Sequence, residues 1–409
     1  MSRRIHCPLY GNIELTELAC SILNTREMQR LRDIKQLGAT YYVFPSANHT
    51  RLEHSLGVYH LAGIMARNLQ KTHPEANITD RDIELIQIAG LIHDIGHGPF
   101  SHLYDHYIKS WGSPEHEERG LRMFETIVKR EKIQLLSKEI TEIQKMIEPG
   151  KKEMYNWKYQ IIANKSCQID VDKIDYILRD SFHLGIPHSG EFKKLLEDVR
   201  LNMTPNNNVE LVWDSKLQFD IYSLFSTRYR LHKKVYTHHT VKGFEYIIIE
   251  IMKLLKSDYS KTKTPLYMRT DSVVTEFCYN NPNHKLAYAL LNRKHPILVG
   301  EVVLKDKEDV QKSKHYELHA DKSLEGMRII IDLIVEELKI GFVSGNDKNP
   351  LTNVYYYSKG KEREEPFKID LSDSSFIIPE KFQERILRLY RYHNSSHKEA
   401  LTYWEEIKK

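Results

Sequence analysis

The chain has 409 residues, of which 41% are hydrophobic and 28% are charged, as in an ordinary folded protein and unlike a disordered one. The formal net charge is only +4, so it indicates neither a nucleic-acid nor a membrane partner, and any basic site must be local. No apolar run approaches the ~18 residues that span a bilayer, and the N-terminus lacks the apolar core of a secretory signal. Four scattered cysteines without a C-x-x-C pair exclude a disulfide scaffold, so we expect an intracellular protein, cytoplasmic or nuclear.

Residue periodicity predicts helices over most of the first 260 residues. The expected helices are 23–32, 51–70, 83–93, 120–148 (as one or two helices), 170–179 and 225–255. Thr79 and Asp82 form the pattern of a capping box at the start of the third helix, and Gly96 and Gly98 end it in a loop. Three consecutive asparagines at 206–208, between two strand-like pieces, predict a hairpin turn.

From about residue 265 the pattern changes. Alternating β-branched and aromatic residues predict strands at 296–304, 352–358 and 374–378, and an amphipathic helix follows at 379–393. We therefore predict a mainly α protein with two parts: a helical catalytic body over residues 1–260 and a smaller α+β lobe over residues 261–409.

Histidines are concentrated in one part of the chain. Nine of the 21 lie between His49 and His116, and His93-Asp94 closes an apolar helix. A hard or borderline divalent cation prefers imidazole and carboxylate ligands, and an adjacent His-Asp pair can direct both at one point. Alone, His-Asp is a common dipeptide. With His54 before it and Asp172 after it, each on a predicted helix, the pattern favours a metal site.

Two helical stripes could bind a ligand beside this metal. Asp172, Tyr176 and Asp180 recur every four residues, with Lys173 next to them, which suits a site for a metal and a polyphosphate. The alternative is a solvated charged face with one buried tyrosine. The second stripe consists of Arg228, His232 and Tyr236, which could bind phosphate and a nucleoside. The alternative interpretation of this second stripe is a basic surface helix or a nucleic-acid patch.

Three segments resemble the HD-domain deoxynucleoside triphosphate triphosphohydrolases. They are FPSANHTRLEHSLG at 44–57, AGLIHDIGHGPFSH at 89–102 and DVDKIDYILRD at 170–180. The likeness extends over nearly the whole chain and is greatest to the animal branch that joins a sterile alpha motif to the HD domain. No sterile alpha motif is recognised, so we expect the sequence to start at the catalytic core.

The resemblance implies a role for each matching residue. It implies a metal, which would be Fe, Zn or Mn, held by His54, His93, Asp94 and Asp172, with Mg accompanying the triphosphate. Substrate contacts would come from Gln36, Leu37, Arg51, His97, His102, Lys173, Tyr176, Asp180, Arg228, His232 and Tyr236. Of these, Gln36, Leu37, Asp180 and Tyr236 match a sugar pocket too tight for a 2′-hydroxyl, and His232 matches a group near the base. Catalytic roles would fall to His97, His102 and His116, with Glu117 orienting His116.

The reaction implied is hydrolysis of a dNTP to a deoxynucleoside and inorganic triphosphate. An activated water would attack the α-phosphorus, and a histidine, either His102 or His116, would protonate the departing 5′-oxygen. Other HD phosphohydrolases act on cyclic nucleotides, nucleoside monophosphates or RNA ends. A nucleotide sensor or nucleic-acid-binding protein with a vestigial HD site is a second alternative, which the intact ligand set disfavours.

The family also implies homo-oligomers, dimer to tetramer, controlled by a nucleotide at a second site. Gln29 and Arg32 match that site, but Asn24 stands where the animal enzyme has a guanine-selecting Asp, Cys7 replaces another Asp, and Thr237 replaces a Gln. An amide cannot accept both guanine N–H groups as a carboxylate does. We therefore expect basal activity without GTP, or activation by a dNTP or another nucleotide.

Overall fold

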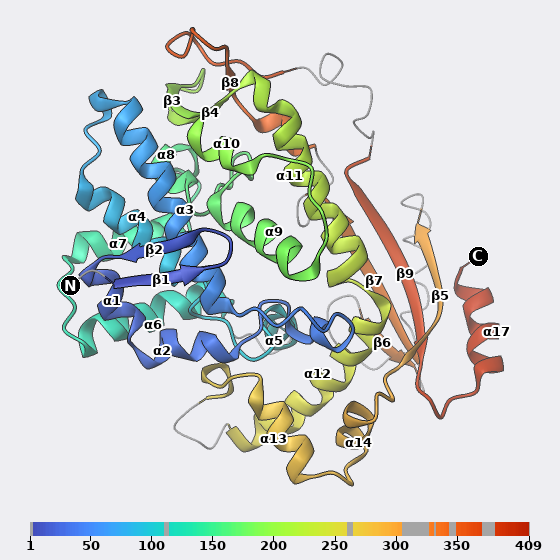
Figure 1. Cartoon of the computed structure of the whole chain (residues 1–409). Coiled ribbons are helices and arrows are strands. Elements are labelled where there is room, and N and C mark those ends of the chain that lie inside the picture. Colours follow the sequence, from blue (N-terminus) through green and yellow to red (C-terminus); the bar gives the residue numbers. More distant parts are fainter. Residues whose placement is uncertain are drawn as a thin grey trace.

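The structure, a computed structural model, describes residues 3–109, 114–259, 265–304, 327–330, 333–342, 349–369 and 381–408. In these ranges a body of helices occupies one side of the molecule and an antiparallel sheet the other, with the N-terminus on the outer side of the body and the C-terminus beyond the sheet (Figure 1). This arrangement confirms the prediction of a mainly α protein with a smaller α+β lobe. None of the helices in these ranges combines the length and the apolarity needed to cross a bilayer.

Helix α3 (Arg51–Thr72) is the central element of the body. It begins with a capping box in which the Thr50 side chain accepts from the backbone N–H of Glu53 and the Glu53 carboxylate accepts from that of Thr50. Apolar and small residues occupy most of its faces, so it is enclosed rather than amphipathic. It packs against α4 (Asp80–Ile92), α9 (Val171–Leu184) and α10 (Phe192–Glu197), and this contact brings the predicted metal ligands together.

Several predicted helices are confirmed with different ends. The capping box of Thr79 and Asp82 does open α4. The charged stretch at 120–148 forms two helices, α6 (His116–Arg130) and α7 (Ser137–Ile147). The helix predicted at 23–32 is wrong as one unit: α1 (Glu17–Leu23) ends at Asn24, and Thr25 caps a new short helix, α2 (Arg26–Gln29), which a 3-10 turn follows. A side-chain cap inside the apolar pattern breaks the helix there.

The helix predicted at 225–255 is also three elements. Helix α11 (Gln218–Leu231) passes into a π-helical turn (His232–Tyr236), and α12 (His239–Tyr259) starts after it. A π turn adds one residue to the helical repeat, which rotates the side chains after it relative to those before. Tyr236 therefore does not continue the regular stripe of Arg228 and His232 that the sequence suggests.

Two small sheets border the body. Strands β1 (Arg3–Cys7) and β2 (Gly11–Leu15) form an N-terminal hairpin. Strands β3 (Val199–Met203) and β4 (Val209–Asp214) form another, and β8 (Tyr356–Tyr357) adds to it in parallel. The predicted turn at 206–208 is confirmed: Asn207 takes the left-handed conformation, with φ of 57°, that asparagine tolerates.

The lobe is built on a four-stranded antiparallel sheet. Its strand order is β5 (Ile297–Leu304), β9 (Gln383–Arg391), β7 (Leu333–Gly341) and β6 (Met327–Ile330). The strand predicted at 296–304 is confirmed, whereas the region 352–358 has only the short β8 after a 3-10 turn, and 374–378 lies outside the described residues. The helix predicted at 379–393 is wrong. It is the strand β9, because β5 and β7 offer hydrogen-bonding edges on both of its sides, and sheet pairing overrides a local helical pattern.

Helices cover both faces of this sheet. Trp404 of α17 (His397–Ile407) packs on Leu387 and Leu389 at the outer face (Figure 1). On the inner face Tyr246 of α12 packs on Tyr390. The domain boundary near residue 260 stays a prediction, and Phe342 and Tyr356 from beyond it are buried in the same cluster as the helices of the body.

Candidate active site

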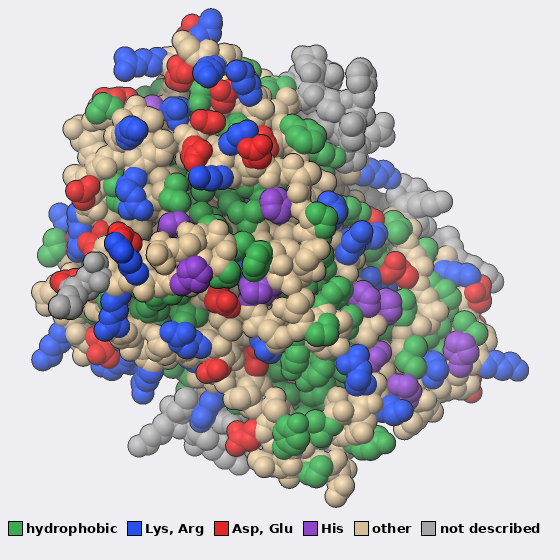
Figure 2. All heavy atoms as spheres, in the orientation of Figure 1, with side chains coloured by type: hydrophobic (Ala, Val, Ile, Leu, Met, Phe, Trp, Pro, Cys, Tyr) green, Lys and Arg blue, Asp and Glu red, His purple; other side chains and the backbone are tan. Residues whose placement is uncertain are grey.

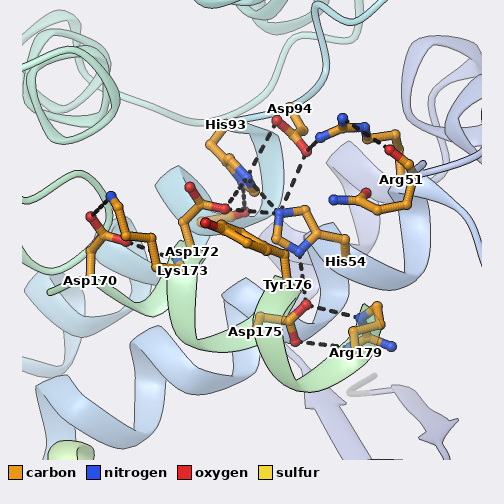
Figure 3. Close-up of polar contacts among 12 residues, drawn as sticks. Arg51, His54, His93, Asp94, Asp170, Asp172, Lys173, Asp175, Tyr176 and Arg179 are labelled. Atoms are coloured by element: carbon orange, nitrogen blue, oxygen red, sulfur yellow. Dashed lines mark hydrogen bonds and ion pairs between the residues drawn. The ribbon is translucent and has the colours of Figure 1, made fainter. Parts of the chain in front are cut away.

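Three helices of the body direct four polar side chains at one point (Figure 3). His54 comes from α3, His93 and Asp94 follow the end of α4, and Asp172 lies in the first turn of α9. The Nε2 atom of His54 is 3.2 Å from Nε2 of His93, 3.0 Å from a carboxylate oxygen of Asp172 and 3.6 Å from one of Asp94. His54, His93 and Asp94 are buried, and the Asp172 side chain is one-third exposed, so Asp172 is the member of the cluster nearest to solvent.

Hydrogen bonds set the orientation of both imidazoles. The Nδ1–H of His93 donates to the carbonyl of Gly90, at 2.7 Å. That of His54 donates to the carboxylate of Asp175, at 2.8 Å. Because Nδ1 carries this proton in each ring, both Nε2 atoms face the shared point as ligand atoms would.

The charges of the cluster suit a cation. Burial would raise the pKa of the Asp94 carboxyl, but Arg51, 2.6 Å away, and His93 hold it well below its ordinary value. Burial lowers the pKa of His54, but its hydrogen bonds to Asp172 and Asp175 raise it to about 10. The carboxylates thus hold an additional proton on His54, at the position a metal would take, and metal binding would release it. Two imidazoles and two carboxylates are a donor set that a divalent metal accepts.

A second cluster of imidazoles adjoins the first. The His97 ring stacks on that of His116, with centroids 3.9 Å apart, and is edge-on to His102, at 4.8 Å. Asp105 in α5 (His102–Lys109) lies 2.9 Å from Nδ1 of His116 and 3.3 Å from Nδ1 of His97. His97 also lies 3.2 Å from Asp94, so it joins the two clusters. Several histidine side chains reach the surface across the middle of this face of the molecule (Figure 2).

These imidazoles differ in proton affinity. Burial lowers the pKa of His116, but its hydrogen bond to Asp105 and the charge of Glu117 raise it above the ordinary value. His102 has the accessible surface of an exposed residue, yet the protein packed around its ring and the charge of Arg51 lower its pKa. Burial and Arg51 also lower the pKa of His97, to about 4. In the free protein His116 therefore holds a second proton more readily than His97 and His102 do.

The predicted phosphate-binding cations lie beside the cluster and already have partners. Lys173 donates to Asp170 at 2.8 Å. Arg228 donates to the phenolic oxygen of Tyr176 at 3.1 Å and to the backbone carbonyl of Gly341, at the end of β7, at 2.8 Å. Phosphate would therefore have to compete with these contacts or add to them.

The predicted sugar-pocket residues form a connected group. Asp180 accepts a 2.7 Å hydrogen bond from His49 and another from the Tyr236 hydroxyl. The backbone N–H of Gln36 donates to the carbonyl of His49, at 3.0 Å. Leu37 follows in the chain, half-buried, and His232 packs edge-on against Tyr236.

Asp271 connects two loops of the site. Its buried carboxylate accepts hydrogen bonds from the backbone N–H of Lys35, before the sugar-pocket residues, and of Phe100, before His102. Phe100 and Ser101 both have left-handed φ, 61° and 58°, a strained conformation for such side chains. Arg51 donates to the Ser101 hydroxyl, which donates to the Lys35 carbonyl, so these contacts maintain the strained loop.

The predicted control residues lie elsewhere, on the surface near the N-terminal hairpin. Arg32 donates to Gln29 at 2.7 Å, and Gln29 donates to the backbone carbonyl of Leu23. Asn24 accepts from Arg3 and lines a pocket of about 310 Å³ together with Arg26, Arg130 and Glu131 among others. Gln29 and Arg32 do not line that pocket.

Comparison with known proteins identifies the family. An HD domain model matches residues 51–180. The Dictyostelium discoideum protein named deoxynucleoside triphosphate triphosphohydrolase SAMHD1 homolog is 31% identical over 405 residues, which cover 95% of this chain and 77% of the relative. The chain belongs to the HD-domain deoxynucleoside triphosphate triphosphohydrolase family. The Homo sapiens member SAMHD1 is also 31% identical, over 94% of this chain and 70% of the human protein. A putative HD domain-containing protein of Acanthamoeba polyphaga mimivirus is 32% identical, over 93% of this chain and 88% of the viral protein.

Membership in this family confirms the resemblance that the three motifs indicate. The structure brings the predicted metal, phosphate and sugar residues into one region, while their individual roles stay predictions. Sequence reasoning missed Asp105, Asp175, His49 and Asp271, which contact the predicted residues. Asp105 and Asp175 each follow a predicted residue by three positions on one helix, a spacing that could have indicated them. Asp271 gives no such signal.

Proposed function

We propose that this protein hydrolyses deoxynucleoside triphosphates to a deoxynucleoside and inorganic triphosphate. The observation that carries the proposal is the convergence of His54, His93, Asp94 and Asp172 beside a second histidine cluster and the two cations predicted to bind phosphate, in a chain of this family. A lone HD-type metal cluster would fit many phosphohydrolases, whereas the adjoining cations and sugar pocket fit a triphosphate on a deoxyribose.

In this proposal His54, His93, Asp94 and Asp172 hold a divalent metal, Fe, Zn or Mn, and Mg accompanies the triphosphate. When bound, such a cation lowers the pKa of coordinated water and neutralises phosphate oxygens. Asp94 stays ionised for this task because Arg51 and His93 stabilise its negative charge.

Charge stabilisation and proton transfer are the roles of the two cations and of the second histidine cluster. Lys173 and Arg228 bind the triphosphate oxygens and take up the charge that develops as water oxygen attacks the α-phosphorus. The bond from phosphorus to the 5′-oxygen breaks, and the 5′-oxygen takes a proton from His116 or His102. Asp105 and Glu117 raise the pKa of His116, which favours its protonated form, and the negative charge of a bound triphosphate would also raise the pKa of His102.

Sugar selection belongs to the group around Asp180. Asp180 accepts from Tyr236 and His49, so both oxygens are fixed in direction and can receive a 3′-hydroxyl. Gln36 and Leu37 close the opposite side, where an added 2′-hydroxyl would find no room. His232, which packs edge-on against Tyr236, would contact the base.

Product analysis tests the proposal directly. The protein is incubated with each dNTP, each NTP and a short RNA in Mn²⁺ and Mg²⁺, and the products are separated by ion-exchange chromatography. We expect equal amounts of deoxynucleoside and triphosphate from dNTPs. Release of monophosphate or pyrophosphate would indicate a different HD phosphohydrolase. Binding without any product would indicate a nucleotide sensor or nucleic-acid-binding protein.

We also propose that a nucleotide regulates this activity and that the protein forms homo-oligomers, from dimer to tetramer. Asn24, with the pocket beside it, is the residue from which we expect the response to a nucleotide base. Sedimentation with and without each nucleotide measures assembly, and the initial rate on one dNTP, measured in parallel, relates assembly to activity.

A further inference from the structure

A buried carboxylate, that of Asp175, lies at the edge of the His54 ring opposite to the other three predicted ligands (Figure 3). Asp175 is wholly buried in α9, three residues after Asp172. Its oxygen Oδ2 accepts the Nδ1–H of His54 at 2.8 Å, which is the contact that turns Nε2 of His54 toward the cluster.

Every acceptor position of this carboxylate is engaged. Besides His54, Oδ2 accepts from Nε of Arg179 at 2.9 Å, and Oδ1 accepts from Nη2 of Arg179 at 2.9 Å and from the Tyr10 hydroxyl at 2.8 Å. Four hydrogen bonds from three directions leave one orientation for the carboxylate. Arg179 is itself wholly buried and lies over the Tyr10 ring, so it too is fixed.

Asp175 and Arg179 can approach helix α3 this closely because the residue at position 57 is a glycine. Gly57 lies one turn after His54, and a Cβ atom added there would be 1.8 Å from Oδ1 of Asp175 and 2.4 Å from Arg179. Any side chain at position 57 would therefore displace the carboxylate that orients His54. Glycine inside a helix costs roughly 0.5–1 kcal/mol relative to alanine, so its presence here needs a reason of this kind.

We propose that Asp175 is a positioning residue that holds His54 in the orientation of a metal ligand, and that Tyr10 and Arg179 hold Asp175. The inference rests on the proposed metal-dependent function. It also connects the N-terminal hairpin to the metal, because Tyr10 lies in the turn between β1 and β2. A shift of that hairpin would move Asp175 and, through it, His54.

The test measures binding of Mn²⁺ alone, by the electron paramagnetic resonance signal of the free ion, with no nucleotide present. Partners of this kind typically change metal affinity by about 10- to 100-fold. Asp175→Asn keeps one oxygen that can accept from His54 but loses the negative charge and the second acceptor for Arg179. We therefore expect Mn²⁺ affinity to fall by a factor in that range. Gly57→Ala should lower affinity similarly without removing any polar group. Tyr10→Phe removes one hydrogen bond and should have a smaller effect of the same sign.

Glu27→Gln is the matched control. Glu27 is a buried carboxylate with a two-bond ion pair to Arg130, and it contacts none of the cluster. Its loss should lower the melting temperature but leave Mn²⁺ affinity unchanged. If Asp175→Asn and Gly57→Ala bind Mn²⁺ as the unmodified protein does, Asp175 is only structural and the inference is overturned. An unmodified protein that binds no Mn²⁺ would overturn it too.

The two proposals can fail separately. If the unmodified protein binds Mn²⁺ and the variants lose affinity, but no dNTP is hydrolysed, the positioning role stands and the proposed reaction falls. If dNTPs are hydrolysed and Mn²⁺ affinity is the same in all variants, the reaction stands and the positioning role falls.

Discussion

The metal cluster and the predicted control region are constructed in opposite ways. At the cluster, side chains from three helices converge, and carbonyl or carboxylate partners behind the imidazoles orient them. In the control region Arg32 and Gln29 bond to each other and to nearby backbone on an exposed surface. The difference indicates that the cluster is organised before any ligand binds, whereas the control residues must exchange their contacts for a nucleotide. The cluster should therefore tolerate substitution poorly and the control region well.

The largest expected effect is loss of the metal ligands. His93→Ala and Asp94→Asn should each abolish dNTP turnover, because both remove a ligand from an organised set and Asp94→Asn also leaves Arg51 without its buried carboxylate. Activity assays with elemental analysis measure this. His397→Ala, at an exposed histidine of α17, should have no effect. Near-normal activity without bound metal in either ligand variant would show that the mechanism is wrong.

The next effect concerns the pH dependence of stability and comes from Asp271. Burial raises its pKa to about 6, while the N–H groups of Lys35 and Phe100 only partly oppose the increase. Between about pH 4 and pH 6 the folded protein keeps a proton that the unfolded chain has lost. This residue's contribution to the free energy of unfolding is therefore fully present below about pH 4 and falls, by about 3 kcal/mol, as the pH rises to 6.

Asp271→Asn removes that titration. The stability difference between the unmodified protein and the variant, measured by urea unfolding at several pH values, should shift in favour of the variant between about pH 4 and 6 and stay constant above. A pH-independent difference would mean that Asp271 does not titrate in this range.

A smaller effect is expected in the sugar pocket. The unmodified protein should hydrolyse dNTPs far faster than NTPs, and Tyr236→Ala should weaken dNTP binding and reduce that preference about 10- to 100-fold, because Asp180 loses its hydroxyl partner and the pocket opens. Steady-state rates on dATP and ATP measure this. Equal rates on the two nucleotides in the unmodified protein would contradict the proposed pocket.

The smallest effect is expected in the control region. Asn24→Asp restores a charged acceptor for guanine and should shift the response toward GTP by about tenfold, the value of one hydrogen bond to a charged group. Initial rates on a single dNTP with and without GTP measure it, and sedimentation follows assembly. An absolute GTP requirement in the unmodified protein that Asn24→Asp does not change would mean that other residues bind the guanine.

Part of the site could be predicted because its signals are local. His93-Asp94 at a helix end, the stripe from Asp172 and the capping box of α4 depend on neighbours a few residues away. Asp271 could not be predicted, since its partners Lys35 and Phe100 are more than 170 positions distant in the chain. Strand β9 could not either, because its pattern suits a helix and only its neighbouring strands decide otherwise.

The sequence by itself therefore determined the family, the mainly helical body and the residue types of the metal cluster, since spacing along a helix fixes which side chains share a face. Tertiary structure alone decided which buried groups lie behind those ligands. Asp175 meets Tyr10 and Gly57 only because α9, α3 and the N-terminal hairpin pack together. A buried carboxylate needs partners from every side, and those partners come from segments that no local pattern connects.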